Sequence, residues 1–177
     1  NFFKIVTFRL AVLVYLPSPP RIIKTTPQKT NFQSVHTFFF LNPNYNFDNF
    51  LEGDSNRLAR SAGMAVANKP GGTSFNPLLV FGGVGLGKTH LAHAIGVEIK
   101  DKYPEKTVLY ISAEKFTQQY IESVKKNTRN DFIHFYQLID VLIIDDVHLL
   151  VNKRKTQVEF LHTFSWLAES GKQIILA

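Results

Sequence analysis

The stretch LLVFGGVGLGKTHLA, residues 78–92, decides the fold class of this chain. It opens with four apolar residues, 78–81, which predict a short buried strand. A glycine-rich turn follows, and apolar residues at helical spacing then predict a helix over 88–102, with Leu91 and Ile95 on its inward face. A strand, a tight turn and a helix in this order are typical of a parallel α/β sheet.

The turn in this stretch fits the pattern G-x-x-x-x-G-K-[ST] at every fixed position. Glycines allow backbone angles that a Cβ forbids, so successive amides can point inward and, with the helix N-terminus, attract a polyphosphate. We expect Lys88 to reach the β- and γ-phosphates of ATP and the Thr89 hydroxyl to ligate Mg²⁺. The alternative is a glycine-rich turn with an incidental lysine. The nucleotide-binding residues predicted here are Gly82, Gly83, Val84, Gly85, Leu86, Gly87, Lys88 and Thr89, with the adjoining His90.

A second motif consists of a continuous apolar run, 141–144, that ends in two carboxylates, Asp145 and Asp146. Ligands of parallel α/β sheets bind at the carboxyl ends of the strands. We therefore expect Asp145 to hold Mg²⁺, directly or through water, and Asp146 to position or polarise the water that attacks the γ-phosphorus. Lys88 and Asp146 are the predicted catalytic residues. Alone, such a pair is more often a solvated turn, but the two motifs together favour a nucleotide site.

The rest of the chain from residue 41 alternates between strand and helix patterns, as in crossover units around a parallel sheet. Asp54 or Ser55 is the expected cap of the first helix, and Leu58, Ile121 and Val124 are expected on inward helix faces. The expected strands cover 107–111, 141–144 and 173–176, and the expected helices cover 56–68, a segment that Ser112 caps, 132–136 and 156–169.

Residues 1–40 differ in composition from the rest. They hold five basic and no acidic residues and seven of the 16 Phe, whereas residues 41–177 carry a net charge of only +1. The apolar run 5–16 is too short to span a bilayer, and no small-x-small cleavage site follows it. We interpret 1–40 as a linker or an unrelated upstream stretch, with 17–30 as an extended, disordered connector, and 41–177 as the domain. The absence of Cys excludes disulfides and fits a cytoplasmic protein.

Several other side chains are candidates for contacts. His90 and His93 have a spacing that suits a metal, but with no third ligand nearby we favour packing or capping. Phe47, Asn49 and Phe50 form an apolar and amide surface that could hold an adenine ring or simply pack. The remaining candidates are basic residues that could contact nucleic acid or be solvated, namely Lys125, Lys126 and Arg129 at a helix end and the run 153–155.

From Leu41 onward, many segments resemble the bacterial replication initiators of the DnaA family. The resemblance rests on 41–50, 55–59, 76–78, 85–91, 112–116, 144–146 and 162–164, which recur in the family's order and spacing. It implies a P-loop AAA+ module that binds ATP and Mg²⁺. It also implies a protein that assembles as a filament on origin DNA in its ATP state, promotes strand opening and is switched off by hydrolysis.

The resemblance also implies roles for individual residues. It places Gly85, Gly87, Lys88, Thr89 and Asp145 in the nucleotide site and Asp146 in the hydrolytic position. The segment 47–56, including Phe47, Asn49 and Asn56, contributes to the adenine pocket. The helix over 116–126 contacts single-stranded DNA, and the predicted DNA-binding residues are Thr117, Lys125, Lys126 and Lys155.

The chain departs from the family at both ends, because it starts with Asn1, stops within a predicted strand and lacks the family's later elements. Residues 1–40 do not resemble its N-terminal partner-binding domain, so a contact with the replicative helicase would involve missing regions. We expect a C-terminally truncated fragment that binds ATP weakly and hydrolyses it barely, since an arginine finger is worth about 10³–10⁵ in rate. The alternatives are a helicase loader or regulatory AAA+ ATPase, and an inactive truncated product.

Overall fold

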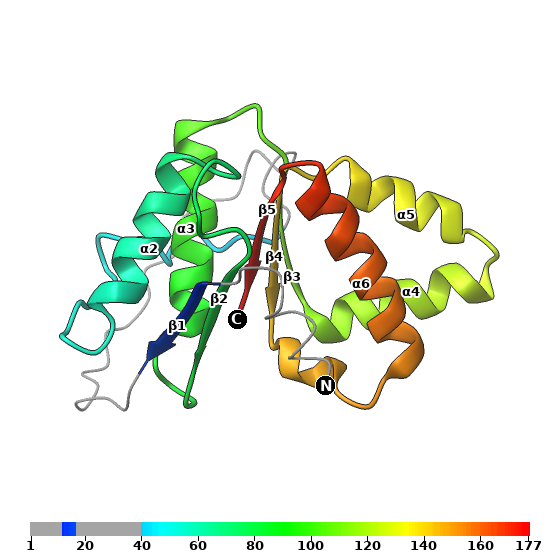
Figure 1. Ribbon diagram of the computed structural model, residues 1–177, viewed down its shortest axis with the longest axis horizontal. Coiled ribbons are helices and arrows are strands. Elements are labelled where there is room, and N and C mark those ends of the chain that lie inside the picture. The colour runs from blue at the N-terminus through cyan, green and yellow to red at the C-terminus, as the bar shows by residue number, and fades with distance from the viewer. Residues whose placement is uncertain (1–11, 17–39) are drawn as a thin grey trace.

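The computed structural model describes residues 12–16 and 40–177 and contains one parallel five-stranded sheet (Figure 1). Its spatial order is β1-β2-β5-β4-β3, and every neighbouring pair runs parallel. The strands are β1 (Val12–Leu16), β2 (Leu78–Gly82), β3 (Val108–Ser112), β4 (Val141–Asp145) and β5 (Gln173–Leu176). The predicted parallel α/β class is confirmed.

Helices cover both faces of this sheet (Figure 1). Side chains alternate between the two faces of a strand, so Leu78 and Val80 join one core and Leu79 joins the other. The first core packs under α2 (Arg57–Asn68) and α3 (Lys88–Lys102). The second core packs under α4 (Ala113–Lys125), α5 (Arg129–Gln137), the 3₁₀ turn η1 (Val147–Leu150) and α6 (Arg154–Glu169).

Among the described helices, only α4 begins with a side-chain cap. Ser112 caps α4 as predicted, because its Oγ accepts the Lys115 N–H at 3.2 Å. The predicted cap of α2 was wrong, since the helix starts after Asn56, which has no side-chain capping bond. Instead, the Asn56 side chain accepts the Gly53 N–H at 2.8 Å and donates to the Leu51 carbonyl at 2.8 Å.

Three apolar side chains predicted to face inward are exposed instead. Leu58 is 66% exposed, Ile121 44% and Val124 52%. In α4 the side chains that pack inward are Phe116, which is fully buried, and the short polar Thr117 and Ser123. The helical period was therefore predicted correctly, but the inward face of α4 is rotated toward Thr117.

Strand β1 lies within residues 1–40, the stretch whose composition favours a linker or an unrelated upstream segment. Val12–Leu16 pairs in parallel register with Leu78–Gly82 and forms an edge of the sheet. The predicted connector 17–30 lies outside the described residues. Among the residues that are described, no helix is both long and apolar enough to cross a membrane.

Candidate nucleotide-binding site

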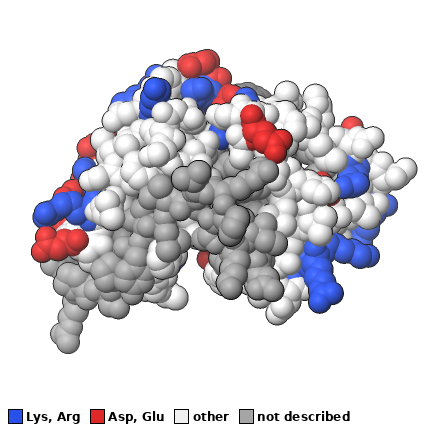
Figure 2. Space-filling model, viewed as in Figure 1, with Lys and Arg blue, Asp and Glu red and all other residues white. Residues whose placement is uncertain are grey.

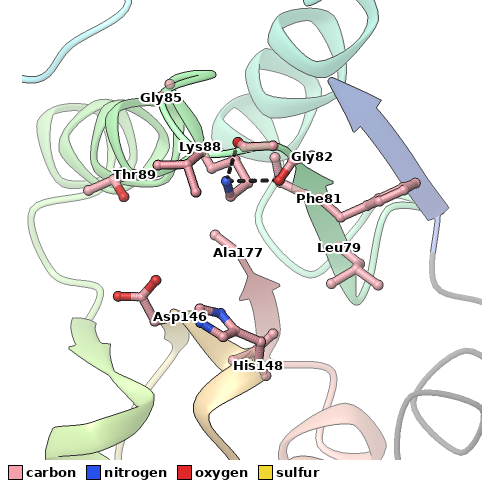
Figure 3. Close-up of a pocket in the computed structure, with 14 residues that line it drawn as sticks. Leu79, Phe81, Gly82, Gly85, Lys88, Thr89, Asp146, His148 and Ala177 are labelled. Atoms are coloured by element: carbon pink, nitrogen blue, oxygen red, sulfur yellow. Dashed lines mark hydrogen bonds between the residues drawn. The ribbon is translucent and has the colours of Figure 1, made fainter. Parts of the chain in front are cut away.

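The glycine-rich turn leaves the carboxyl end of β2 and enters α3. Gly85 has a φ of 80° and Gly87, the N-cap of α3, a φ of 83°. Both values lie in the left-handed region, where a Cβ costs about 1–2 kcal/mol, which explains glycine at these positions. The Lys88 ammonium folds back over the turn and donates to the carbonyls of Gly82 at 3.1 Å and Gly83 at 2.8 Å (Figure 3).

A cavity of about 840 Å³ lies against this turn. Figure 3 shows Lys88 and Thr89 on one side of it, Asp146 and His148 on the other, and Ala177 between them. The cavity thus lies at the carboxyl ends of β2, β4 and β5, where α/β sheets bind their ligands. Its lining residues are Leu79, Val80, Phe81, Gly82, Gly83, Val84, Gly85, Gly87, Lys88, Thr89, Asp146, Val147, His148 and Ala177.

The carboxylate of Asp145 is buried behind this cavity and receives three hydrogen bonds. Its Oδ2 accepts the Thr89 hydroxyl at 2.7 Å and the Tyr110 hydroxyl at 2.7 Å, and its Oδ1 accepts the Asp146 N–H at 2.8 Å. Burial, and then the bond to Asp145, raises the pKa of Tyr110, so the phenol stays protonated and donates. These contacts bring the two sequence motifs into direct contact through Thr89 and Asp145.

The oxygen donors at this point fit Mg²⁺. A carboxylate and a hydroxyl 2.7 Å apart are ligands that Mg²⁺ prefers, and it completes its coordination with waters and phosphates rather than with a full protein cage. The described residues contain no group of three or more His, Cys, Asp or Glu side chains placed to hold a metal. Thr89 and Asp145 offer oxygen ligands that could hold Mg²⁺.

Asp146 has an uncommon backbone conformation for a non-glycine residue, with a φ of 54°. Such residues are energetically costly and cluster at functional sites. Asp146 is exposed and lines the cavity, while the preceding Asp145 is buried. The turn after β4 thus buries the Asp145 carboxylate and places the Asp146 carboxylate in the lining of the cavity.

The predicted adenine-pocket residues lie outside the cavity lining. Phe47 is buried in the first core, where the Arg60 guanidinium lies 5.7 Å from its ring centroid. Asn56 shapes the turn before α2, as described above. Asn49 is exposed, and its Oδ1 lies 2.9 Å from Nε2 of His90, which also lies 3.0 Å from the Asn46 carbonyl. The side chains of Phe47 and Asn56 therefore support the 41–56 segment from within.

The two histidines of α3 pack against the 41–50 segment, as expected. The His93 Nδ1 accepts the Asn42 N–H at 3.1 Å, and the His93 ring stacks on Tyr110 with centroids 3.8 Å apart. Burial lowers the pKa of His93, an effect that Asp145 opposes, so the imidazole is neutral. His90 and His93 thus attach the 41–50 segment to the helix that carries Lys88.

A second hollow of about 820 Å³ separates α4 from the start of α6. Figure 2 shows Lys and Arg side chains gathered over this part of the molecule. Of the predicted DNA-binding residues, Thr117 and Lys125 line the hollow, whereas Lys126 and Lys155 do not, and Lys126 pairs with Glu122 at 3.8 Å. Sequence reasoning missed the lining residue Lys115, whereas Lys153 belongs to the basic run 153–155 that it named as a candidate. The Thr117 hydroxyl donates to the Ala113 carbonyl within α4.

Comparison with known proteins relates the chain to one family. The sequence model described as the bacterial DnaA ATPase domain matches residues 41–177. Over 136 residues, the chain is 83% identical to the chromosomal replication initiator protein DnaA of Flavobacterium psychrophilum. This match covers 77% of the chain but only 28% of that relative.

Two solved structures are similar at the level of the fold and the sequence. Domain III of the Thermotoga maritima replication initiation protein DnaA has a TM-score of 0.74 and 44% identity, over 77% of this chain and 56% of that one. A replication initiator DnaA bound to AMPPCP and single-stranded DNA has a TM-score of 0.74 and 43% identity, over 78% of this chain and 42% of that one.

Proposed function

The chain belongs to the family of bacterial DnaA ATPase domains, and we propose that residues 41–177 bind ATP with Mg²⁺ and contact single-stranded DNA during replication initiation. The observation that carries the nucleotide proposal is the contact between Thr89 and Asp145, which joins the glycine-rich turn to the acidic strand end. The similar DnaA structure with bound AMPPCP and single-stranded DNA supports the proposal of both a nucleotide and a DNA ligand.

Each residue of the proposed nucleotide site has a separate role. Lys88 exchanges its two carbonyl contacts for phosphate oxygens, while the amides of the turn and the α3 N-terminus face the phosphate charge. Thr89 and Asp145 would hold Mg²⁺, and the exposed Asp146 would orient the attacking water. When bound, Mg²⁺ supplies charge neutralisation of the phosphates.

Calorimetric titration with ATP and Mg²⁺ tests this assignment. We expect Lys88→Ala to weaken ATP binding by at least 10-fold, because it removes the only lysine ammonium that lines the cavity in the described part of the chain. Lys126→Ala is the matched control, since Lys126 caps the C-terminal end of α4 and does not line the cavity. Equal affinities of the two variants would refute the phosphate assignment, and no binding by the parent would support the inactive-fragment alternative.

The single-stranded DNA contact is assigned to the hollow between α4 and α6, whose lining includes three exposed lysines: Lys115, Lys125 and Lys153. Two carboxylates, Glu114 and Glu122, also line it, so the phosphates of a bound strand would lie against the lysines and away from these two side chains. Each phosphate contact contributes about −0.7 to the slope of log affinity against log salt for single strands.

Fluorescence anisotropy with labelled single-stranded DNA tests this surface. We expect Lys125→Ala and Lys153→Ala each to weaken binding and to reduce the salt slope by about 0.7. Lys102→Ala is the control, because Lys102 ends α3 on the other face of the sheet. If Lys125→Ala and Lys153→Ala both keep the parent's salt slope, these lysines are excluded as phosphate contacts.

The wider role of the protein is proposed from its family. We propose action at a replication origin in the cytoplasm, with self-association into a filament in the ATP state and a replicative helicase contact through other regions. The 83% identity to a replication initiator favours this role over that of a helicase loader. Chemical cross-linking between copies of the chain, in the presence of ATP and separately of ADP, tests the self-association directly.

A further inference from the structure

Tyr110 reaches the metal carboxylate from a strand that carries neither nucleotide motif. In the register of β3 and β4, Tyr110 lies opposite Ile143, and Asp145 lies two residues further along β4. Side chains two residues apart on a strand point to the same face, so Tyr110 and Asp145 share the face that α3 covers. From there the Tyr110 hydroxyl donates to Asp145 Oδ2 at 2.7 Å.

The ring of Tyr110 is held in place from the other side. His93 of α3 stacks on it with an interplanar angle of 26° and is itself fixed by the Asn42 N–H at 3.1 Å. Tyr45 lies beyond His93, with ring centroids 5.4 Å apart. The Tyr110 ring is therefore packed between its own strand and α3. Residues of the 41–50 segment hold the stacked His93 in place.

The other two donors to Asp145 are already engaged in other ways. The Thr89 hydroxyl is the second metal ligand proposed above, so it would give a lone pair to the ion while its hydrogen donates to Oδ2. The Asp146 N–H fixes only Oδ1. The Tyr110 hydroxyl is the one donor to Oδ2 that has no other task at the site.

We infer that Tyr110 is a positioning residue that orients the Asp145 carboxylate for Mg²⁺ through its hydrogen bond to Oδ2. This inference rests on the proposed nucleotide function and extends it to a residue outside both motifs. Hydrogen-bonded partners of metal ligands fix ligand orientation, and their loss costs about 10–100-fold in metal affinity. The alternative is that the Tyr110 ring only packs in the core and its hydroxyl only gives the buried Asp145 Oδ2 a hydrogen bond.

Tyr110→Phe separates the two interpretations, because it keeps the ring against His93 and removes only the hydroxyl. ATP affinity is measured by titration in EDTA and again in excess Mg²⁺, and the ratio of the two gives the gain due to the metal. We expect the affinity in EDTA to stay within about twofold of the parent, and the Mg²⁺ gain to fall about 10-fold. Tyr136→Phe, whose hydroxyl contacts Gln119 in the second core, is the control and keeps the full gain.

Two results would overturn the inference. One is a Tyr110→Phe variant whose ATP affinity rises with Mg²⁺ as much as the parent's does. In that case the hydroxyl has no role in orienting the carboxylate. The other is an equal loss of affinity with and without Mg²⁺, which indicates general damage to the site. A parent chain that binds no ATP in either buffer refutes the proposed function itself, a result distinct from both.

Discussion

Replacing Gly87 by alanine tests the physical basis of the glycine-rich turn. Gly87 has a φ of 83°, and an added Cβ would lie 3.4 Å from the Phe50 ring, which is ordinary contact. The cost is therefore backbone strain of about 1–2 kcal/mol rather than a clash. Alanine also restricts the unfolded chain, which offsets about 0.4–1 kcal/mol. The net expectation is a loss of about 1 kcal/mol.

Thermal denaturation followed by circular dichroism measures this difference. A loss of about 1 kcal/mol lowers the Tm of a domain of this size by about 2–4 °C. Gly53→Ala is the matched control, because no atom lies within 4 Å of its added Cβ and its φ lies outside the left-handed region. We expect that variant to melt at or slightly above the parent temperature. Equal melting temperatures for the two variants would show that the turn does not require a left-handed residue at position 87.

Two further predictions concern the supporting structure. Phe116 is fully buried among three aromatic rings, so Phe116→Ala should cost about 3–5 kcal/mol in denaturant unfolding, and a loss below 1 kcal/mol would contradict this packing. Burial alone would raise the pKa of Asp140, but hydrogen bonds from Lys172 at 2.6 Å and the Thr107 N–H at 2.9 Å outweigh it and hold that pKa below its usual range. This depressed pKa gives stability that is present above the unfolded value near 4 and is lost as pH falls through the folded value. Urea unfolding between pH 6 and 3 should therefore show a weaker pH dependence for Asp140→Asn than for the parent, and identical profiles would refute the assignment.

The elements that position the nucleotide site could be predicted from local patterns. The apolar runs at 78–81 and 141–144 are short and continuous, and each is followed by glycines or carboxylates that indicate the approaching end of a strand. Their ends in the structure fall at Gly82 and Asp145, one residue beyond each predicted run. The predicted strands were therefore accurate to one residue at the ends that carry the two motifs.

Contacts between distant segments could not be read in the same way. The run 5–16 has the composition of a strand, but nothing local indicates that Val12–Leu16 pairs with β2. The Tyr110 bond to Asp145 depends on the register of β3 against β4, which the sequence does not specify. Leu58 was misplaced for a related reason, because helical spacing gives the period of a helix but not which part of its apolar arc meets the sheet.

A crystal structure grown with Mg²⁺ and a non-hydrolysable ATP analogue tests the central claim most directly. The account predicts the triphosphate in the 82–89 turn, with the Lys88 ammonium moved from the Gly82 and Gly83 carbonyls to phosphate oxygens. It also predicts the metal beside Thr89 and Asp145. A nucleotide bound elsewhere, with Lys88 still on the two carbonyls and Asp145 facing no metal, would contradict it.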